Sequence, residues 1–135
     1  MNQKVVFTNG CFDIVHRMHL ELLSFCRNGL DSKKVIVGLN SDDSVRKLKG
    51  DSRPIFDEED RKFLLESLEY VDEVILFDEE TPYNLIKELK PDIIVKGGDY
   101  LSHEVVGSDL CEVVIFPYSD KYSTTKAIKK LGAKL

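Results

Sequence analysis

The chain has 135 residues, a formal net charge of −5 at pH 7, and 42% hydrophobic and 32% charged residues. A chain of this length supplies one compact core, so we expect a single domain over residues 1–135. The negative charge argues against a broad nucleic-acid surface, because such binding neutralises many phosphates. No apolar run approaches the ~18 residues of a membrane span, and no signal-peptide region precedes the first apolar run. We therefore expect a cytoplasmic protein that binds neither nucleic acid nor membrane.

Five short β-branched runs recur along the chain, and they are continuously apolar rather than alternating. Strands that are buried on both faces have this pattern, and the stretches between the runs carry helical patterns. We predict an α/β fold of the Rossmann-like, three-layer α/β/α type with a five-stranded parallel sheet. The strands are expected at 5–7, 35–37, 74–76, 93–95 and 113–115.

The first helix is expected to follow the first strand, with Leu20, Leu23 and Cys26 on one apolar stripe. It should stop near Gly29, a suitable C-terminal cap. A short helix is expected after Ser41. The three cysteines lack paired metal-ligand spacing, so we expect reduced thiols.

Three further helices are predicted in the second half of the chain. Asp57 can cap a helix whose first turn is acidic. Thr81 is expected to cap the next helix with Pro82 at its first position, and this helix must end before Pro91. The last helix should follow Ser123 and run to about Leu131. The helix after Asp57 is expected to carry the apolar residues Phe63, Leu64 and Leu68.

Polar segments follow four of the five predicted strands. In open α/β sheets, ligands bind beyond the carboxyl ends of the strands, where the strand order reverses. We therefore expect four separate loops to converge on one edge of the sheet and to form a binding site there. The segments are 8–10, 40–43, 96–100 and 118–125.

His16 and His19 are three positions apart at the first strand-to-helix junction. At that spacing the two imidazoles lie on one helix face, near the end where free N–H groups and the helix dipole attract anions. We expect them to bind phosphate. Cys11 lies beside them but lacks a base partner of its own, so we do not expect a nucleophile. The preceding loop is expected to line the same site, with Asp13 either capping the helix or orienting the site; its residues are Thr8, Asn9, Gly10, Phe12 and Asp13.

Cations are expected to reach this site from two loops. Lys47 or Lys49 can supply a mobile charge that neutralises phosphate, whereas Arg46 is expected on the exposed side of its helix. Lys96 offers another cation. It precedes Gly97, a glycine at which a ligand can approach closely.

Two further polar groups complete the predicted site. Asp99 offers a carboxylate suited to a ribose or substrate hydroxyl. Ser123 and Thr124 stand before the last helix, where hydroxyl residues commonly serve as N-caps. One of them can cap while the other faces phosphate.

The region around the two histidines resembles the His-x-Gly-His signature of the nucleotidyltransferases, with Met18 where that family has glycine. Over residues 5–130 the chain is similar to the heptose-1-phosphate adenylyltransferases, which form a domain of ADP-heptose synthase. The segments that carry this similarity are Leu39-Asn40-Ser41-Asp42, residues 48–54, and Lys96-Gly97-Gly98-Asp99-Tyr100.

The resemblance implies transfer of AMP from ATP to a sugar 1-phosphate with release of pyrophosphate. It also implies magnesium held mainly by phosphates rather than by protein ligands, and a homodimer. His16 and His19 would steady the triphosphate, Arg61 would contact the nucleotide phosphates, and Ser123 and Thr124 would bind triphosphate oxygens. Met18 would either reshape the nucleotide pocket or block it.

Two alternatives stay open at this point. Glycerol-3-phosphate cytidylyltransferases, which use CTP, share both histidines and the Ser-Thr-Thr segment. The arginine that those enzymes carry shortly before Ser-Thr-Thr is absent here, where Tyr118 and Lys121 occupy the neighbourhood. The other alternative is a nucleotide-binding homologue whose catalysis is weakened by Met18. Acceptor recognition depends on a few scattered loop side chains, so the sequence leaves the acceptor, and with it the pathway, open.

Overall fold

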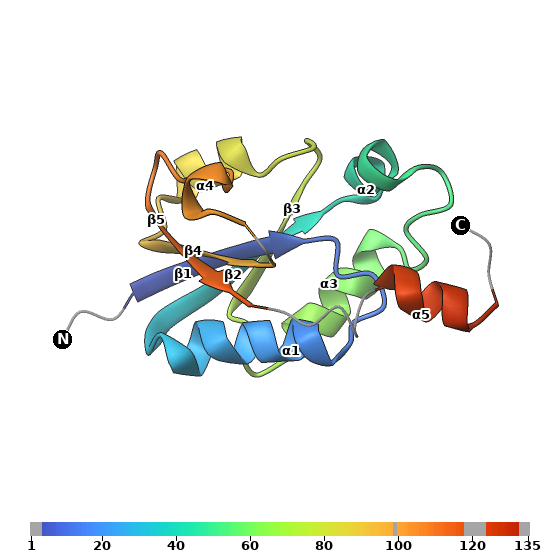
Figure 1. Cartoon of the computed structure of the whole chain (residues 1–135), viewed down its shortest axis with the longest axis horizontal. Coiled ribbons are helices and arrows are strands. Elements are labelled where there is room, and N and C mark those ends of the chain that lie inside the picture. Colours follow the sequence, from blue (N-terminus) through green and yellow to red (C-terminus); the bar gives the residue numbers. More distant parts are fainter. Residues whose placement is uncertain (1–3, 99, 118–123, 133–135) are drawn as a thin grey trace.

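The computed structural model describes residues 4–98, 100–117 and 124–132, without the side chains of residues 124 and 125. Its five strands are all parallel and form one sheet in the order β3-β2-β1-β4-β5 (Figure 1). The predicted five-stranded parallel sheet is therefore confirmed. The strands are β1 (Lys4–Gly10), β2 (Ser32–Asn40), β3 (Glu73–Phe77), β4 (Ile93–Gly97) and β5 (Glu112–Phe116).

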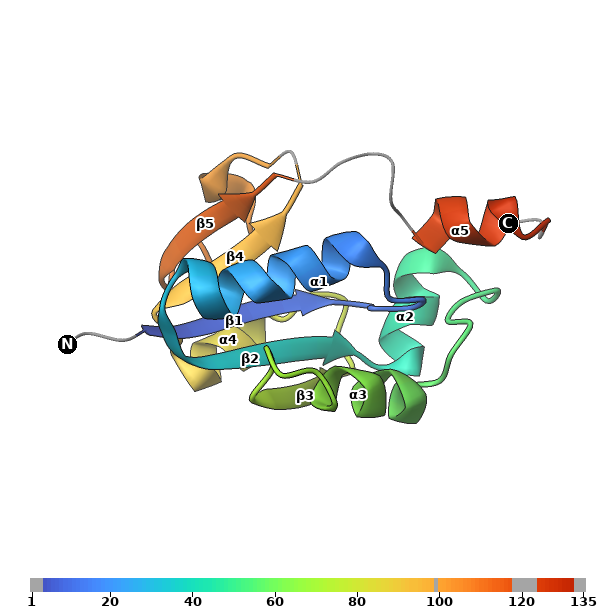
Figure 2. The ribbon, with the colours of Figure 1, turned by 90° about the horizontal axis from the view of Figure 1, so that it is seen from below.

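Helices cover both faces of the sheet. Figures 1 and 2 show α1 and α3 on one face and α4 on the other, which confirms the three-layer arrangement. A π-helical turn at Phe25–Gly29 continues α1, and a 3-10 turn lies at Ser102–Glu104. The α-helices are α1 (Arg17–Ser24), α2 (Asp42–Lys49), α3 (Glu58–Glu66), α4 (Tyr83–Leu89) and α5 (Thr124–Lys130). In the part of the chain described here, no helix is long and apolar enough to cross a membrane.

The core is divided by the sheet, because successive side chains of a strand point to opposite faces. Val6 packs on one face with Cys26 of the turn after α1. Its neighbour Phe7 packs on the other face with Ile86 of α4. Burial on both faces explains why the strands are continuously apolar.

The predicted cap of α3 is confirmed, and α2 follows Ser41 as expected, with Ser41 as its cap. The Ser41 hydroxyl accepts a hydrogen bond from the Ser44 N–H at 3.2 Å, and Asp57 accepts from the Asp60 N–H at 2.9 Å. The prediction for α4 is wrong by one residue, because Pro82 rather than Thr81 is its cap and the helix begins at Tyr83.

Three predicted apolar positions are wrong in their placement. The side of α3 that faces the core carries Leu65 and Arg61, whereas Phe63 and Leu64 are 74% and 43% exposed. Arg61 occupies a position on the buried side of α3 where an apolar residue is expected. The apolar residues of the sequence alone therefore predict the wrong buried side for this helix. In α1, Leu23 is fully buried but Leu20 is 36% exposed.

The strand order reverses between β1 and β4. From β1 the chain adds β2 and β3 on one side, then crosses to add β4 and β5 on the other. The buried Thr8 hydroxyl donates to the Val95 carbonyl at 2.9 Å and holds the two central strands together near this point. A crevice outside these carboxyl ends is where open α/β sheets bind ligands.

Candidate active site

A cavity of about 720 Å³ opens at the carboxyl ends of β1 and β4. Its volume lies within the range of about 300–1,000 Å³ typical of small-molecule sites. The wall is built from the β1–α1 loop, the start of α1, the end of α2, the segment before α4, and the residues after β4. Three of the four polar segments predicted to converge therefore contribute to one cavity; most of the fourth, 118–125, lies outside the described residues.

Most of the predicted site residues lie in this wall, whereas Lys47 and Arg61 are not among the described lining residues. Asp99 and Ser123 lie outside the described residues, as does the side chain of Thr124. The predicted residues in the wall are Thr8, Asn9, Gly10, Phe12, Asp13, His16, Met18, His19, Lys49, Lys96 and Gly97.

His16 and His19 stack at the start of α1. Their ring centroids are 4.0 Å apart, and the Phe12 ring lies 5.2 Å from His19. The backbone N–H of His16 donates to Nδ1 of His19 at 3.1 Å. In a neutral imidazole the other nitrogen then carries the proton, so His19 presents an Nε2–H donor.

The surroundings keep both imidazoles neutral at pH 7. Burial, with a smaller contribution from the neighbouring His16, lowers the pKa of His19 to about 4. Burial also lowers the pKa of His16. The pair therefore supplies hydrogen-bond donors rather than positive charge.

The loop that carries the histidines is strained and held by Asp13. Phe12 and Ile14 have φ angles of 47° and 58°, which cost non-glycine residues about 1–3 kcal/mol each. Between them, the buried Asp13 carboxylate accepts from the N–H groups of Ile55 and Phe56 at 2.7 and 3.0 Å. The N-cap of α1 is His16, so Asp13 does not cap the helix; its contacts join the loop to the 53–56 segment instead.

Arg61 lies beneath the wall and is 2% exposed. Its Nη1 donates to the carbonyls of Cys11 and Asn40, both at 2.8 Å. Its Nε donates to the Phe56 carbonyl at 2.9 Å and its Nη2 to Asp42 at 2.8 Å. These contacts occupy the guanidinium and indicate a positioning role, in place of the phosphate contact that the resemblance implies.

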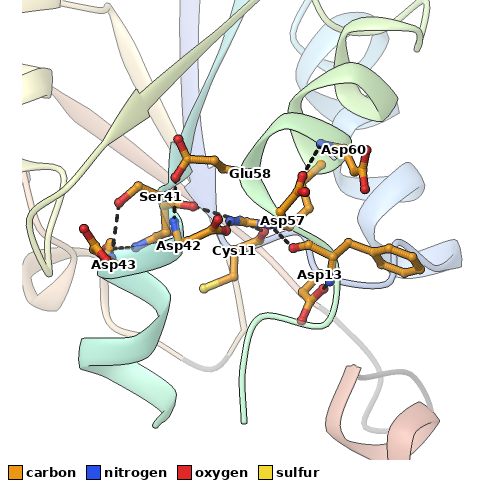
Figure 3. Close-up of polar contacts among 12 residues, drawn as sticks. Cys11, Asp13, Ser41, Asp42, Asp43, Asp57, Glu58 and Asp60 are labelled. Atoms are coloured by element: carbon orange, nitrogen blue, oxygen red, sulfur yellow. Dashed lines mark hydrogen bonds and ion pairs between the residues drawn. The ribbon is translucent and has the colours of Figure 1, made fainter. Parts of the chain in front are cut away.

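Figure 3 shows the segments that meet in this region, with Cys11 and Asp13 of the β1–α1 loop near the first turns of α2 and α3. The Asp42 N–H donates to Glu58 at 3.0 Å and so links the starts of these two helices. Cys11 lines the cavity, and burial raises the pKa of its thiol. A protonated thiol is a weak nucleophile, which agrees with the prediction for Cys11.

Two lysines bring positive charge to the wall. Lys49, at the end of α2, is exposed, whereas Lys96 is partly buried with its Nζ 5.3 Å from the centroid of the Tyr100 ring. Burial lowers the pKa of Lys96, and nearby Lys49 acts in the same direction. Arg46 pairs with Asp43 on the surface, as predicted.

Sequence reasoning missed several residues of the wall. Arg53 is buried there, although it stands in a charged run that has the composition of an exposed loop. The local sequence carries no signal of this burial, which depends on the contact with Asp13, 40 residues away. Other missed residues of the wall are Leu22, Leu48, Glu80, Thr81, Pro82, Glu104, Val105, Val106 and Phe116.

The fold and the wall together define a class: a parallel α/β domain with a cavity, lined by two histidines and two lysines, at its topological switch point. The comparison with known families agrees, because the Cytidylyltransferase-like family model matches residues 7–130. The chain belongs to this family, which confirms the resemblance to the nucleotidyltransferases.

The chain is also similar to individual known proteins along almost its whole length. It is 52% identical over 130 residues to the bifunctional protein HldE of Helicobacter pylori (strain P12), and 51% identical over 132 residues to HldE of Aliarcobacter butzleri (strain RM4018). The matches cover 96% and 97% of this chain but only 28% and 27% of those relatives.

A solved structure is similar over most of the chain. It is the lipopolysaccharide core biosynthesis protein from Thermoplasma volcanium GSS1, with a TM-score of 0.70 and 29% identity. The match covers 90% of this chain and 100% of that one.

The role of Arg61 gives a prediction about stability. Lysine has one nitrogen and cannot serve four acceptors, so Arg61→Lys leaves buried carbonyls without donors and should lower the free energy of unfolding by about 3 kcal/mol. Urea denaturation at pH 7 measures this, with Arg46→Lys as a surface control that changes it by less than about 0.5 kcal/mol. Equal, small losses in both variants would contradict the positioning role.

The neutral His19 gives a prediction about pH. Its pKa is about 4 in the folded chain and 6.5 ordinarily, so between these values the unfolded chain binds a proton that the folded chain does not. The free energy of unfolding should therefore fall as the pH drops from 6.5 to 4, by up to about 3 kcal/mol from this group.

Urea denaturation at pH 7.5, 6.5, 5.5 and 4.5 measures the effect. His19→Asn is the matched variant, because its side-chain oxygen can accept the same backbone N–H without titrating. It should lose less stability than the natural chain over this range, and parallel curves would show that His19 is not the group responsible.

Proposed function

We propose that this domain is an adenylyltransferase that transfers AMP from ATP to a sugar 1-phosphate, heptose 1-phosphate-like, and releases pyrophosphate. The observation that carries the proposal is the joint presence of His16, His19, Lys49 and Lys96 in one cavity at the switch point of the sheet. The similarity to HldE and to a protein of lipopolysaccharide core biosynthesis favours a sugar phosphate as the acceptor.

The proposed reaction is a single in-line displacement. A phosphate oxygen of the sugar 1-phosphate attacks the α-phosphorus of ATP, and the bond from that phosphorus to the bridging oxygen of the β-phosphate breaks. Pyrophosphate takes the electron pair and leaves. Because the attacking phosphate oxygen is already ionised, no general base is needed, and positioning and charge stabilisation carry the step.

The residues of the wall suit these two tasks. His19 Nε2–H can donate to a phosphate oxygen while remaining neutral. Lys49 and Lys96 supply charge against the developing pyrophosphate. The first turn of α1 carries no acidic side chain, so its free N–H groups favour an anion.

A second group of lining side chains suits a sugar. Glu80, Thr81, Tyr100 and Glu104 line the cavity with carboxylate and hydroxyl groups. Such groups bind sugar hydroxyls through hydrogen bonds. We therefore propose that the acceptor contacts these side chains, with its phosphate toward the histidines.

Magnesium is proposed to accompany the triphosphate and to neutralise part of its charge. Among the described residues, no group of three or more His, Cys, Asp or Glu side chains is arranged to hold a metal ion. Mg²⁺ keeps several waters and commonly binds substrate phosphates with few protein ligands, so such a wall is compatible with an ion held mainly by phosphates.

Met18 supports a reshaped pocket rather than a blocked one. The cavity of about 720 Å³ is present with the Met18 side chain in its wall. A flexible thioether can also adjust to a ligand. We therefore favour an active enzyme over a homologue with weakened catalysis.

Three predicted contacts extend the proposal beyond the described residues. Asp99 is proposed to bind a ribose or substrate hydroxyl, and Ser123 and Thr124 are proposed to bind triphosphate oxygens.

We also propose a homodimer in the cytoplasm; the 74% exposed Phe63 of α3 is compatible with a covered surface. Light scattering of the purified protein measures the mass in solution, and a monomer would refute the dimer.

The substrate pair is the first test of this function. Pyrophosphate release should be fastest with ATP and heptose 1-phosphate, and at least about tenfold slower with CTP or with glycerol 3-phosphate. Faster release with CTP and glycerol 3-phosphate would instead identify a cytidylyltransferase. ATP binding without release from any pair would identify the weakened homologue.

The two candidate lysines give a second test. Lys49 lines the cavity and Lys47 does not, although both are exposed on α2. Lys49→Ala should lower kcat/KM for ATP by about 10- to 100-fold, and Lys47→Ala should change it by less than about 2-fold. The melting temperatures of both variants should match that of the natural chain. A larger effect of Lys47→Ala would reverse the assignment.

A further inference from the structure

Arg53 holds an unusual position for a cation. It lies in the segment between α2 and α3, it is 5% exposed, and it belongs to the wall of the cavity. A guanidinium is always charged, and a buried charge requires partners. The partners of Arg53 therefore show what the side chain can do.

Only part of the guanidinium is bonded to the protein. Nε donates to the Asp13 carboxylate at 3.0 Å, and the two side chains are 6% and 0% exposed. Asp13 also accepts from two backbone N–H groups, so its carboxylate is fixed by three donors. The bond to Nε in turn fixes the plane and the direction of the guanidinium.

The two Nη groups of Arg53 have no hydrogen-bond acceptor among the described residues. Neither Nη group is among the fully buried side-chain atoms that lack a hydrogen-bond partner. Both are therefore accessible from open space. Because the residue is almost entirely buried and lines the cavity, that space is the cavity. Arg53 thus directs two parallel N–H donors into the site.

Arg61 shows the contrast within the same fold. All three of its nitrogens donate to protein acceptors, and it is not among the described lining residues. The two buried arginines therefore differ in what they leave available: Arg61 binds protein segments together, whereas Arg53 keeps a fork of donors for a ligand.

We propose that Arg53 binds a phosphate group of the substrates through its two Nη groups, and that Asp13 is the positioning residue that aims this fork. A planar guanidinium matches two phosphate oxygens in a bidentate contact, which a lysine cannot make. The inference rests on the proposed function for the identity of the substrates. The phosphate belongs either to the nucleotide or to the sugar 1-phosphate.

Arg53→Lys tests the proposal. The lysine keeps the charge and can pair with Asp13, but its single nitrogen leaves no fork for the ligand. We expect a melting temperature close to that of the natural chain and a KM raised about 10-fold or more for the substrate whose phosphate Arg53 binds. A rise in the KM for ATP identifies the nucleotide, and a rise in the KM for heptose 1-phosphate identifies the acceptor.

Direct binding separates this proposal from the proposed function. Calorimetric titration with ATP, inorganic pyrophosphate and heptose 1-phosphate needs no turnover, so it applies even if the natural chain releases no pyrophosphate. Affinity for at least one of these probes should fall about 10-fold in Arg53→Lys. Unchanged affinities for all three would overturn the role of Arg53.

Two variants complete the design. Asp13→Asn keeps the shape of the side chain but loses its charge, so it should weaken the same probe as Arg53→Lys and leave the other probes unchanged. Arg46→Lys, a surface arginine paired with Asp43, should change no affinity. If Arg53→Lys unfolds, Arg53→Gln replaces it, and a folded Arg53→Gln with natural affinities would also overturn the proposal.

Discussion

The four hydrogen bonds of the buried Arg61 guanidinium are the interaction on which the site depends. Through them one side chain joins the end of β1, the end of β2, the start of α2 and the segment before α3. At three of these points the acceptor is a backbone carbonyl, of Cys11, Asn40 or Phe56. A single cation that satisfies three such carbonyls and a carboxylate makes the loops one rigid unit. The cavity wall can then be precise although it is built from loops.

Asp13 performs the corresponding task with the opposite charge. It accepts from Arg53 and from two backbone N–H groups of the 53–56 segment, while its own neighbours Phe12 and Ile14 hold left-handed conformations. The strained loop is therefore held from outside rather than by its own preference, as expected where strain persists at a functional site. Burial of the Asp13 carboxylate and of the Arg61 guanidinium is acceptable because each has several hydrogen-bond partners.

The sequence predicts the sheet well and the loops only in part. Continuous apolar runs such as 35–37 identify buried parallel strands, because burial on both faces leaves little freedom in residue type. The histidines were also found, since their spacing at a strand-to-helix junction is informative. Burial of Arg53 and Arg61 was not foreseen. An arginine in a charged run has the same local pattern whether it lies in solvent or beneath a loop, and only contacts between residues distant in the sequence decide which.

The residues that line the cavity differ in whether they supply hydrogen bonds or positive charge. His16 and His19 are neutral, so they can donate hydrogen bonds to a ligand without adding positive charge to the site. Charge comes instead from Lys49 and Lys96, and Arg53 adds a fork of fixed direction. Fixed donors suit a group that must be placed accurately, and mobile ammonium groups suit one whose charge moves as pyrophosphate departs. A site for nucleotidyl transfer needs both kinds, because the displacement succeeds only when the attacking oxygen, the α-phosphorus and the leaving oxygen stay in line while negative charge shifts away from them.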